Sequence, residues 1–235
     1  MEIQFEKSPF FEQDVTELLR ELSGIGFFTH GLLIGSWPMV VYADHFTLMY
    51  GLTTGDIDFA VIGAMRVPPT PPETVPEVLN RLGYSSVHDY DAGIETFLHG
   101  EFEVEFLTHR KDGGRGEGSV LIQPWKVAAQ PLPFIDLLFI RPATIVIEDF
   151  SISIPSPEAL MLHKLIIAQR RTGKDKELKK GKDLQQCSVL VEVARPEEVQ
   201  QLLAEYKMSR EVQRQMEMSC AEAGIAVPGG LPWQR

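Results

Sequence analysis

The sequence of 235 residues predicts an α/β (α+β) fold followed by a helical C-terminal part. Two observations lead to this prediction. Before residue 155, short apolar runs of strand length alternate with segments that have helical spacing. From Ser156 to about Ser219 the chain contains only segments that read as helices. We therefore expect an α/β domain over residues 1–155 and a helical domain over residues 156–235, with no internal repeat.

The first 84 residues supply two of the expected strands. In the segment 10–23, apolar residues at helical spacing predict a helix. The stretch FFTHGLLIGS (27–36) predicts a buried strand that ends in a Gly-Ser turn, and 37–51 is predicted to be mostly helical. DIDFAVIG (56–63) predicts a strand. A proline-rich loop from Val67 then leads into a short helix, which begins at Thr74 or Pro76 and ends at Gly83.

The remaining elements follow from alternation, glycine content and helix-start signals. ETFLHG and EFEVEFLTH predict a hairpin with its turn at His99-Gly100. RKDGGRGEGS (110–119) predicts a glycine-rich linker, and 134–157 predicts two or three strands. Ser156, Pro157 and Glu158 form a strong helix start. Three further helices are predicted, over residues 179–194, 196–208 and 209–224. Residues 227–235 are expected to form a loose tail.

Composition limits the range of functions. The net charge is −11 and the isoelectric point is near 5.0, which argues against broad, non-specific binding to nucleic acid. One basic island, residues 170–182, holds seven Lys or Arg against two acids. The two cysteines, Cys187 and Cys220, match no metal or redox spacing. With no signal peptide and no apolar run of membrane length, we expect a cytoplasmic protein with no membrane partner.

Carboxylates on two predicted strands suggest a metal site. Residues i and i+2 of a strand project from the same face, so Asp56 and Asp58 point the same way. The same rule places Glu101, Glu103 and Glu105 on one face of the second strand of the hairpin. If that strand pairs beside 56–63, carboxylates from both strands converge. A divalent cation, Mg²⁺ or Mn²⁺, would compensate their repulsion, as in sites for phosphoryl or nucleotidyl transfer.

A Gly-Ser turn, a strand with Asp-x-Asp and a single carboxylate on a later strand together resemble the nucleotidyltransferase superfamily, which has the polymerase-β-like fold. Nineteen residues, Trp37 to Gly55, separate the turn from the first aspartate, a longer gap than the family usually has. The longer gap and the segment PSPEALMLHKL make the chain look more like two groups within this superfamily. These are bacterial nucleotidyltransferase-like proteins and nucleotidyltransferases of the abortive-infection or toxin type. The resemblance covers roughly residues 27–190. It implies a mixed sheet with flanking helices.

The resemblance also implies roles for individual residues. Gly35 and Ser36 would hold the nucleotide phosphates, with Thr54, Lys164 and Lys182 as further nucleotide contacts. The metal ligands and catalytic carboxylates would be Asp56, Asp58 and Glu105, with Glu103 as the alternative for the third position.

Other interpretations of some of these residues stay open. Trp37 is either core or a stacking surface for a base, and His163 is expected to be a packing residue. The basic island is either a solvated turn or a patch for ATP phosphates or an RNA end. Asp183 is expected to pair with Lys164 or with a nearby arginine.

Three functions are compatible with the sequence. The first is a Mg²⁺-dependent enzyme that transfers a nucleoside monophosphate from ATP or another NTP to an unidentified acceptor. That acceptor is a small molecule, a protein or a tRNA end. The second is a catalytically inactive nucleotide- or metal-binding module, as in a defence or toxin–antitoxin system. The third is an interaction protein with an acidic cleft and no ligand. The sequence gives no indication of the oligomeric state.

Overall fold

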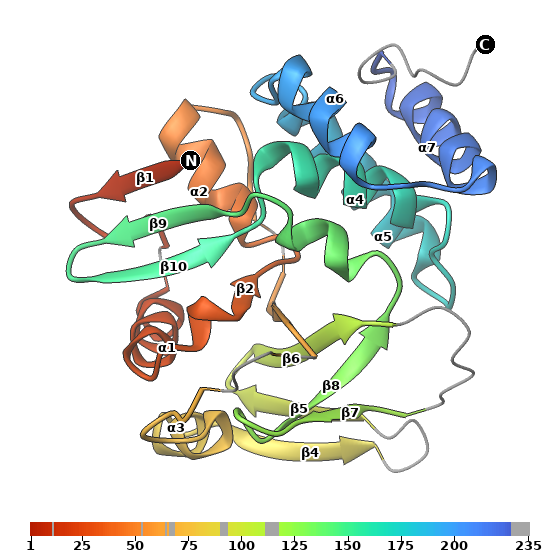
Figure 1. The fold of residues 1–235 in the computed structure, drawn as a ribbon. Helices are drawn as coiled ribbons and strands as arrows, with labels where there is room; N and C mark the ends of the chain where they lie inside the picture. Colours follow the sequence, from red (N-terminus) through yellow and green to blue (C-terminus); the bar gives the residue numbers. More distant parts are fainter. Residues whose placement is uncertain are drawn as a thin grey trace.

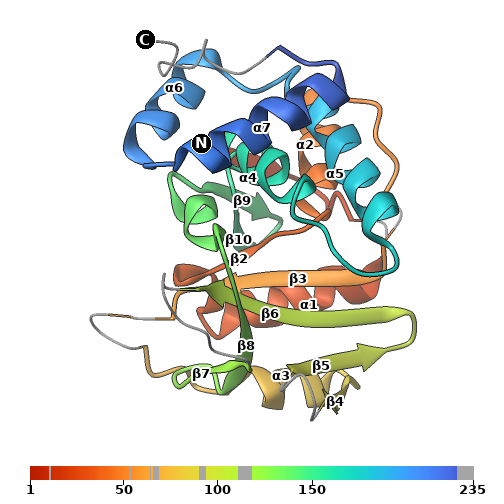
Figure 2. The same cartoon turned by 90° about the vertical axis from the view of Figure 1, so that its right-hand side faces the viewer.

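The computed structural model describes residues 1–10, 12–52, 54–63, 65, 69–89, 94–110 and 118–226. Most of the predicted glycine-rich linker and the whole predicted tail lie outside these residues. The described chain forms a mixed α/β structure in which the C-terminal helices gather on one side, above the strands (Figures 1 and 2). None of the described helices combines the length and apolar character needed to cross a membrane.

The larger of the two sheets carries the carboxylate strands. Its main path runs in the order β2 (Gly31–Leu33), β3 (Asp56–Val61), β6 (Phe102–His109), β5 (Ile94–His99) and β4 (Ser85–Asp89). β3 and β6 are parallel, whereas β2–β3, β5–β6 and β4–β5 are antiparallel. β6 also pairs in parallel with β8 (Val127–Leu132), which pairs with β7 (Val120–Ile122). The expected mixed sheet is therefore confirmed.

A smaller sheet has the order β1 (Glu2–Phe5), β9 (Ala143–Ile147) and β10 (Phe150–Ile154). Three described α-helices lie between β1 and β9 in the chain: α1 (Gln13–Gly24), α2 (Pro38–Phe46) and α3 (Val75–Arg81). Four more follow: α4 (Pro157–Ala168), α5 (Lys176–Leu190), α6 (Pro196–Glu205) and α7 (Arg210–Ala223). Two short 3₁₀ helices, Phe27–Thr29 (η1) and Ile135–Phe139 (η2), complete the described elements.

The two faces of β3 and β6 differ in chemistry because side chains alternate along a strand. One face packs into the main core, where the Phe59 and Phe106 rings stack at 5.6 Å and Ile57 is fully buried. The other face carries Asp58 and Glu105. Farther along it, Ala60 and Leu107 belong to a second, smaller apolar cluster. The described core thus fixes which side of the sheet presents the carboxylates.

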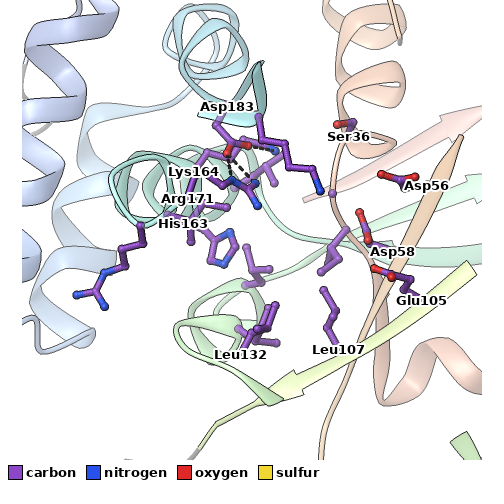
Figure 3. A pocket seen from close by; sticks show the side chains of 18 of the residues that line it. Ser36, Asp56, Asp58, Glu105, Leu107, Leu132, His163, Lys164, Arg171 and Asp183 are labelled. Atoms are coloured by element: carbon purple, nitrogen blue, oxygen red, sulfur yellow. Dashed lines mark hydrogen bonds and ion pairs between the residues drawn. The ribbon is translucent and has the colours of Figure 1, made fainter. Parts of the chain in front are cut away.

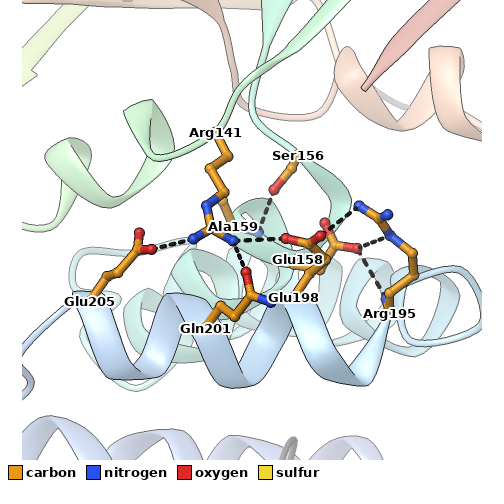
Figure 4. Close-up of polar contacts among 8 residues, drawn as sticks. All are labelled: Arg141, Ser156, Glu158, Ala159, Arg195, Glu198, Gln201 and Glu205. Atoms are coloured by element: carbon orange, nitrogen blue, oxygen red, sulfur yellow. Dashed lines mark hydrogen bonds and ion pairs between the residues drawn. The ribbon is translucent and has the colours of Figure 1, made fainter.

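α4 is buried along almost its whole length, so its apolar run is typical of a core helix. The Ser156 hydroxyl caps it by accepting from the Ala159 N–H at 3.2 Å. Near the same end, the buried Glu158 carboxylate accepts a bond from the Arg195 backbone N–H at 3.0 Å (Figure 4). Arg141, before β9, reaches Glu198 on α6 at 2.9 Å. The Arg141–Glu198 contact connects α6 to the segment before β9, and the division at residue 155 stays a prediction.

Most predicted elements are present, with two corrections. The segment 27–36 is not one strand, because η1 precedes a short β2. The prediction of two or three strands in 134–157 is confirmed, because β9 and β10 follow η2 there. Glu101 lies at the hairpin turn and is exposed, so it is not on the strand face with Glu103 and Glu105. β1, β4, β7 and β8 have no counterpart among the predicted elements.

Candidate active site

The parallel pairing of β3 with β6 brings the predicted carboxylates side by side. In the register of the two strands, Asp56 pairs with Glu103 and Asp58 pairs with Glu105. Paired residues of neighbouring strands project from the same face, so the four acids share one surface. The condition on which the predicted site depended, that the two acidic strands lie next to each other, is therefore met.

A pocket of about 350 Å³ lies between this face of the sheet and helices α4 and α5. Figure 3 shows Asp58 and Glu105 on one wall and the α4 and α5 side chains on the other. The lining contains acids, bases and apolar residues from six parts of the chain. They are Ile34, Gly35, Ser36, Asp56, Asp58, Glu105, Leu107, Gln130, Leu132, Pro133, Ile135, Leu138, Leu160, His163, Lys164, Ile167, Arg170, Arg171, Lys179, Lys182 and Asp183.

The acids on the sheet wall are held at a cost in free energy. Burial, together with repulsion from Asp56, raises the pKa of Asp58 above its ordinary value. Burial and repulsion from Asp58 raise the pKa of Glu105 to about 7. Lys164, Lys182 and Arg171 act in the opposite direction on Asp58. The sheet wall therefore has unbalanced negative charge that a bound cation would relieve.

The turn after β2 lies directly against Asp58. Gly35 has φ +70°, and a Cβ placed on it would come within 2.1 Å of the Asp58 Oδ2 atom. The Ile34 N–H donates to the Asp58 carbonyl at 2.9 Å. Glycine is required at position 35 for two reasons, the left-handed backbone and the close approach of the carboxylate.

The next residue, Ser36, is buried at the start of α2, where its hydroxyl is held by the helical half. The Gln186 amide of α5 donates to the Ser36 Oγ atom at 3.0 Å and to the Tyr50 hydroxyl at 2.6 Å. The Oγ atom still has its own proton to donate. The Ser36 hydroxyl is thus positioned from behind and can donate into the pocket.

Basic side chains face the carboxylates from α4 and α5. Lys164 is buried and its Nζ atom lies 3.3 Å from the Asp183 Oδ1 atom, while Arg171 contacts Oδ2 at 2.7 Å. The expected pairing of Asp183 is therefore present with both partners. Lys182 lines the pocket and forms no ion pair with any residue in the described ranges. This side of the pocket can receive an anion.

The structure separates the predicted site residues into two groups. Gly35, Ser36, Asp56, Asp58, Glu105, Lys164 and Lys182 all line the pocket. Thr54 does not; its hydroxyl accepts from the Asp56 N–H at 3.3 Å, so it supports the strand start. Glu103 also lies outside the lining, which favours Glu105 as the third carboxylate. Trp37 is fully buried and donates to the Asp56 carbonyl at 2.8 Å, so it is core.

Several lining or supporting residues were not predicted to belong to the site. Arg171 and Lys179 lie in the basic island, so their charge was a signal for them. Gln186 and Tyr50 carry no sequence signal, because their role depends on a contact between residues 136 positions apart. His163 was interpreted as a packing residue, yet it lines the pocket.

The described side chains do not form a ready-made metal site. Within the described ranges, no three His, Cys, Asp or Glu residues form a group that could hold a metal ion as they stand. The donor chemistry nevertheless fits a hard divalent cation, because carboxylate oxygens on adjacent strands carry uncompensated charge. Asp56, Asp58 and Glu105 would hold such an ion.

Comparison with known proteins identifies the family. A family model described as nucleotidyltransferase matches residues 13–213. No protein with a curated description matches the chain. Among solved structures, an antigenic nucleotidyltransferase-like protein from Paracoccidioides brasiliensis is 15% identical, with a TM-score of 0.46 over 90% of this chain and 92% of that one. The antibiotic-resistance factor ANT(2'')-Ia is 14% identical, with a TM-score of 0.42 over 88% of this chain and 97% of that one. Because the family model spans most of the sequence, the chain belongs to the nucleotidyltransferase family.

Proposed function

We propose that the protein is an active nucleotidyltransferase that uses Mg²⁺, or Mn²⁺, and ATP or another NTP. The observation that carries the proposal is the pairing of Asp58 with Glu105 in one pocket with the Gly35-Ser36 turn and the basic face of α4 and α5. A pocket with acids on one wall and bases on the other suits a triphosphate with a bound cation. Family membership implies a nucleotide substrate and an acceptor.

The chain's own groups have distinct tasks in this proposal. Ser36 and Lys182 bind the β- and γ-phosphates, so the departing pyrophosphate leaves towards the β2 turn and α5. When bound at Asp56, Asp58 and Glu105, divalent cations stabilise the attacking and leaving oxygens. The acceptor oxygen forms a bond to the α-phosphorus while the bond to the β-phosphate oxygen breaks. Glu105 takes the proton that the acceptor hydroxyl loses.

Lys164 has a different task from the one the resemblance implies. Its ammonium is already paired with Asp183, on the buried side of the pocket. We propose that this pair fixes the α4–α5 wall and adds positive potential. Direct phosphate contact then falls to Lys182 and to Lys179, which is exposed on α5.

The inactive binding module remains the second candidate, because the described carboxylates do not stand as a complete ligand group. Two measurements separate the candidates. Binding is followed by thermal unfolding with each of the four NTPs and Mg²⁺ or Mn²⁺; a ligand at about 100 times its Kd adds about 2.7 kcal/mol. Transfer is followed with α-³²P-labelled NTP and three acceptor pools: small metabolites, proteins and tRNA.

An active enzyme labels one pool and releases pyrophosphate, and Glu105→Gln retains nucleotide binding but loses labelling. A binding module shows the stabilisation and no labelling. If no NTP raises the Tm with either metal, the proposed function is wrong.

A further inference from the structure

One half of the pocket is apolar and is not used by the proposed chemistry. Along the sheet face, Asp58 is followed two residues later by Ala60, and Glu105 by Leu107. Leu107, Ile34, Ile135 and Leu138 form a buried cluster, against which Leu132 packs. All of these except Ala60 also line the pocket. Beyond the carboxylates, then, the pocket wall changes from acidic to apolar.

A buried polar group lies in this apolar half. His163 on α4 is 8% exposed, and its Nε2 atom has no hydrogen-bond partner among the residues that the structure describes. Figure 3 shows the ring extending from α4 into the pocket, on the side of Leu132. Burial, reinforced by Lys164 and Arg171, lowers the pKa of His163 to about 3, so the ring is neutral. An unpaired buried polar atom destabilises the protein, and a ligand with a polar edge would relieve that cost by bonding to it.

The order of the strands places the part of this half formed by Leu107 and Leu132 on the acceptor side. From β2 through β3 and β6 to β8, the sheet presents Ser36, Asp58, Glu105 and then Leu132. In an in-line displacement, the acceptor attacks the phosphorus from the side opposite the leaving group. With pyrophosphate leaving at the Ser36 end, as the proposed function requires, the acceptor approaches from beyond Glu105.

We propose that this apolar half is the acceptor subsite, and that the acceptor is an uncharged small molecule with a hydroxyl group on an apolar or aromatic ring. This inference rests on the proposed function. The ring would pack on Leu107, Leu132 and Ile135, and a polar group of the acceptor would bond to the His163 Nε2 atom. The charge at the edge of this wall is already engaged within the described residues: Arg170 lies over the Phe134 ring at 4.8 Å and donates to Gln215, so it is held away from a phosphate backbone. A tRNA end is therefore disfavoured.

The test uses 2-naphthol, an uncharged aromatic alcohol, as the probe. Its Kd is measured by fluorescence titration, with and without Mg²⁺ and α,β-methylene-ATP. We expect binding in the high micromolar range or tighter, unaffected by the nucleotide analogue. Spermidine and the trinucleotide CCA, which stand for a polycation and an RNA end, should not displace 2-naphthol.

Three variants report on the subsite. Leu132→Gln is expected to weaken 2-naphthol binding about tenfold, from the loss of apolar contact. His163→Leu is expected to weaken it about fivefold, and His163→Gln, which keeps a polar group, about twofold or less. Leu98→Gln is the matched control, because Leu98 is 40% exposed on β5 and is not in the pocket.

The outcomes are separable. If 2-naphthol does not bind at 1 mM, or if Leu132→Gln and His163→Leu bind it as the wild type does, the subsite is wrong. Competition with α,β-methylene-ATP would assign the apolar half to the nucleobase and overturn the acceptor assignment, as would displacement by CCA or spermidine. Absence of Mg²⁺-dependent binding of α,β-methylene-ATP in the wild type would instead refute the proposed function, whatever the naphthol titration gives.

Discussion

Replacing Asp58 with asparagine should make the ligand-free protein more stable. Asp58 and Glu105 are paired across neighbouring parallel strands, and both are half-buried. Neighbouring strands lie about 4.8 Å apart. At an effective dielectric constant of about 20, two charges at that separation repel each other by about 3.5 kcal/mol. Attraction to Lys164, Lys182 and Arg171 and screening by salt offset most of this, so we expect a net gain of about 1 kcal/mol.

The assay is urea and thermal unfolding at pH 8 in EDTA, which is above the pKa of about 7 of Glu105. A gain of about 1 kcal/mol corresponds to a rise in Tm of about 2–4 °C for a protein of this size. Asp44→Asn is the matched control, because Asp44 is exposed on α2 and outside the pocket. It should change the Tm by less than about 1 °C.

The same variant should lose its response to ligand. With Mg²⁺ and an NTP analogue at about 100 times the Kd, the wild type should gain about 2.7 kcal/mol and Asp58→Asn almost nothing. A ligand-free Asp58→Asn protein that is less stable than the wild type would mean that the carboxylate is already compensated within the fold. Unchanged stabilisation by the ligand would mean that the cation binds elsewhere. Either result would refute the reasoning.

Three further perturbations test the supporting structure. Gly35→Ala should abolish nucleotide-dependent stabilisation in the thermal-shift assay, because its Cβ would meet a pocket carboxylate at 2.1 Å. Gly26 also has a positive φ but has open space around it, so Gly26→Ala should keep the nucleotide-dependent stabilisation. Equal stabilisation of the two variants would contradict the clash at Gly35. Asp183→Leu should lower the free energy of unfolding in urea by about 3–5 kcal/mol, because it leaves Lys164 buried without its carboxylate. Adding Lys164→Met should recover most of that loss. A double variant as unstable as Asp183→Leu would contradict the pairing. His163 stays neutral when folded but takes up a proton below about pH 6.5 when unfolded, so lowering the pH from 7.5 to 5.5 should destabilise the wild type by about 1.4 kcal/mol more than His163→Leu. Parallel pH profiles of these two proteins would show that the ring is accessible to protons in the fold.

The sequence was most informative where one periodic pattern decided both fold and site. Alternation in 56–61 and 102–109 predicted the strands β3 and β6 and the shared face of Asp56 with Asp58. The helix start at Ser156 was likewise predictable, because capping is a local interaction. β4 was missed because all five of its residues are exposed, so its pattern has no apolar side. β8 contains Gln130 and Pro131, which hide its strand character.

The site was predictable only in the residues that belong to a local sequence pattern, either the Gly35-Ser36 turn or a run of charged side chains. The pairing of Asp58 with Glu105 rather than with Glu103 depends on the register of two strands that are far apart in sequence. The role of Gln186 depends on its contact with Ser36, 150 residues away. The apolar half of the pocket combines residues of the turn after β2 and of β6, β8, η2 and α4. Because these residues are far apart in the sequence, no local pattern could predict this surface or its distance from the phosphate side. Both became visible only in the folded structure.

A crystal structure with Mn²⁺ and α,β-methylene-ATP is the most direct measurement of the proposed transfer site. Manganese gives an anomalous signal that locates the ion independently of the surrounding density. We predict a peak bonded to carboxylate oxygens of Asp56 and Asp58, with the triphosphate extending towards Ser36 and Lys182. A manganese ion and a triphosphate bound away from these aspartates, or a pocket left empty at saturating concentrations of both, would contradict a transfer site at this end of the sheet.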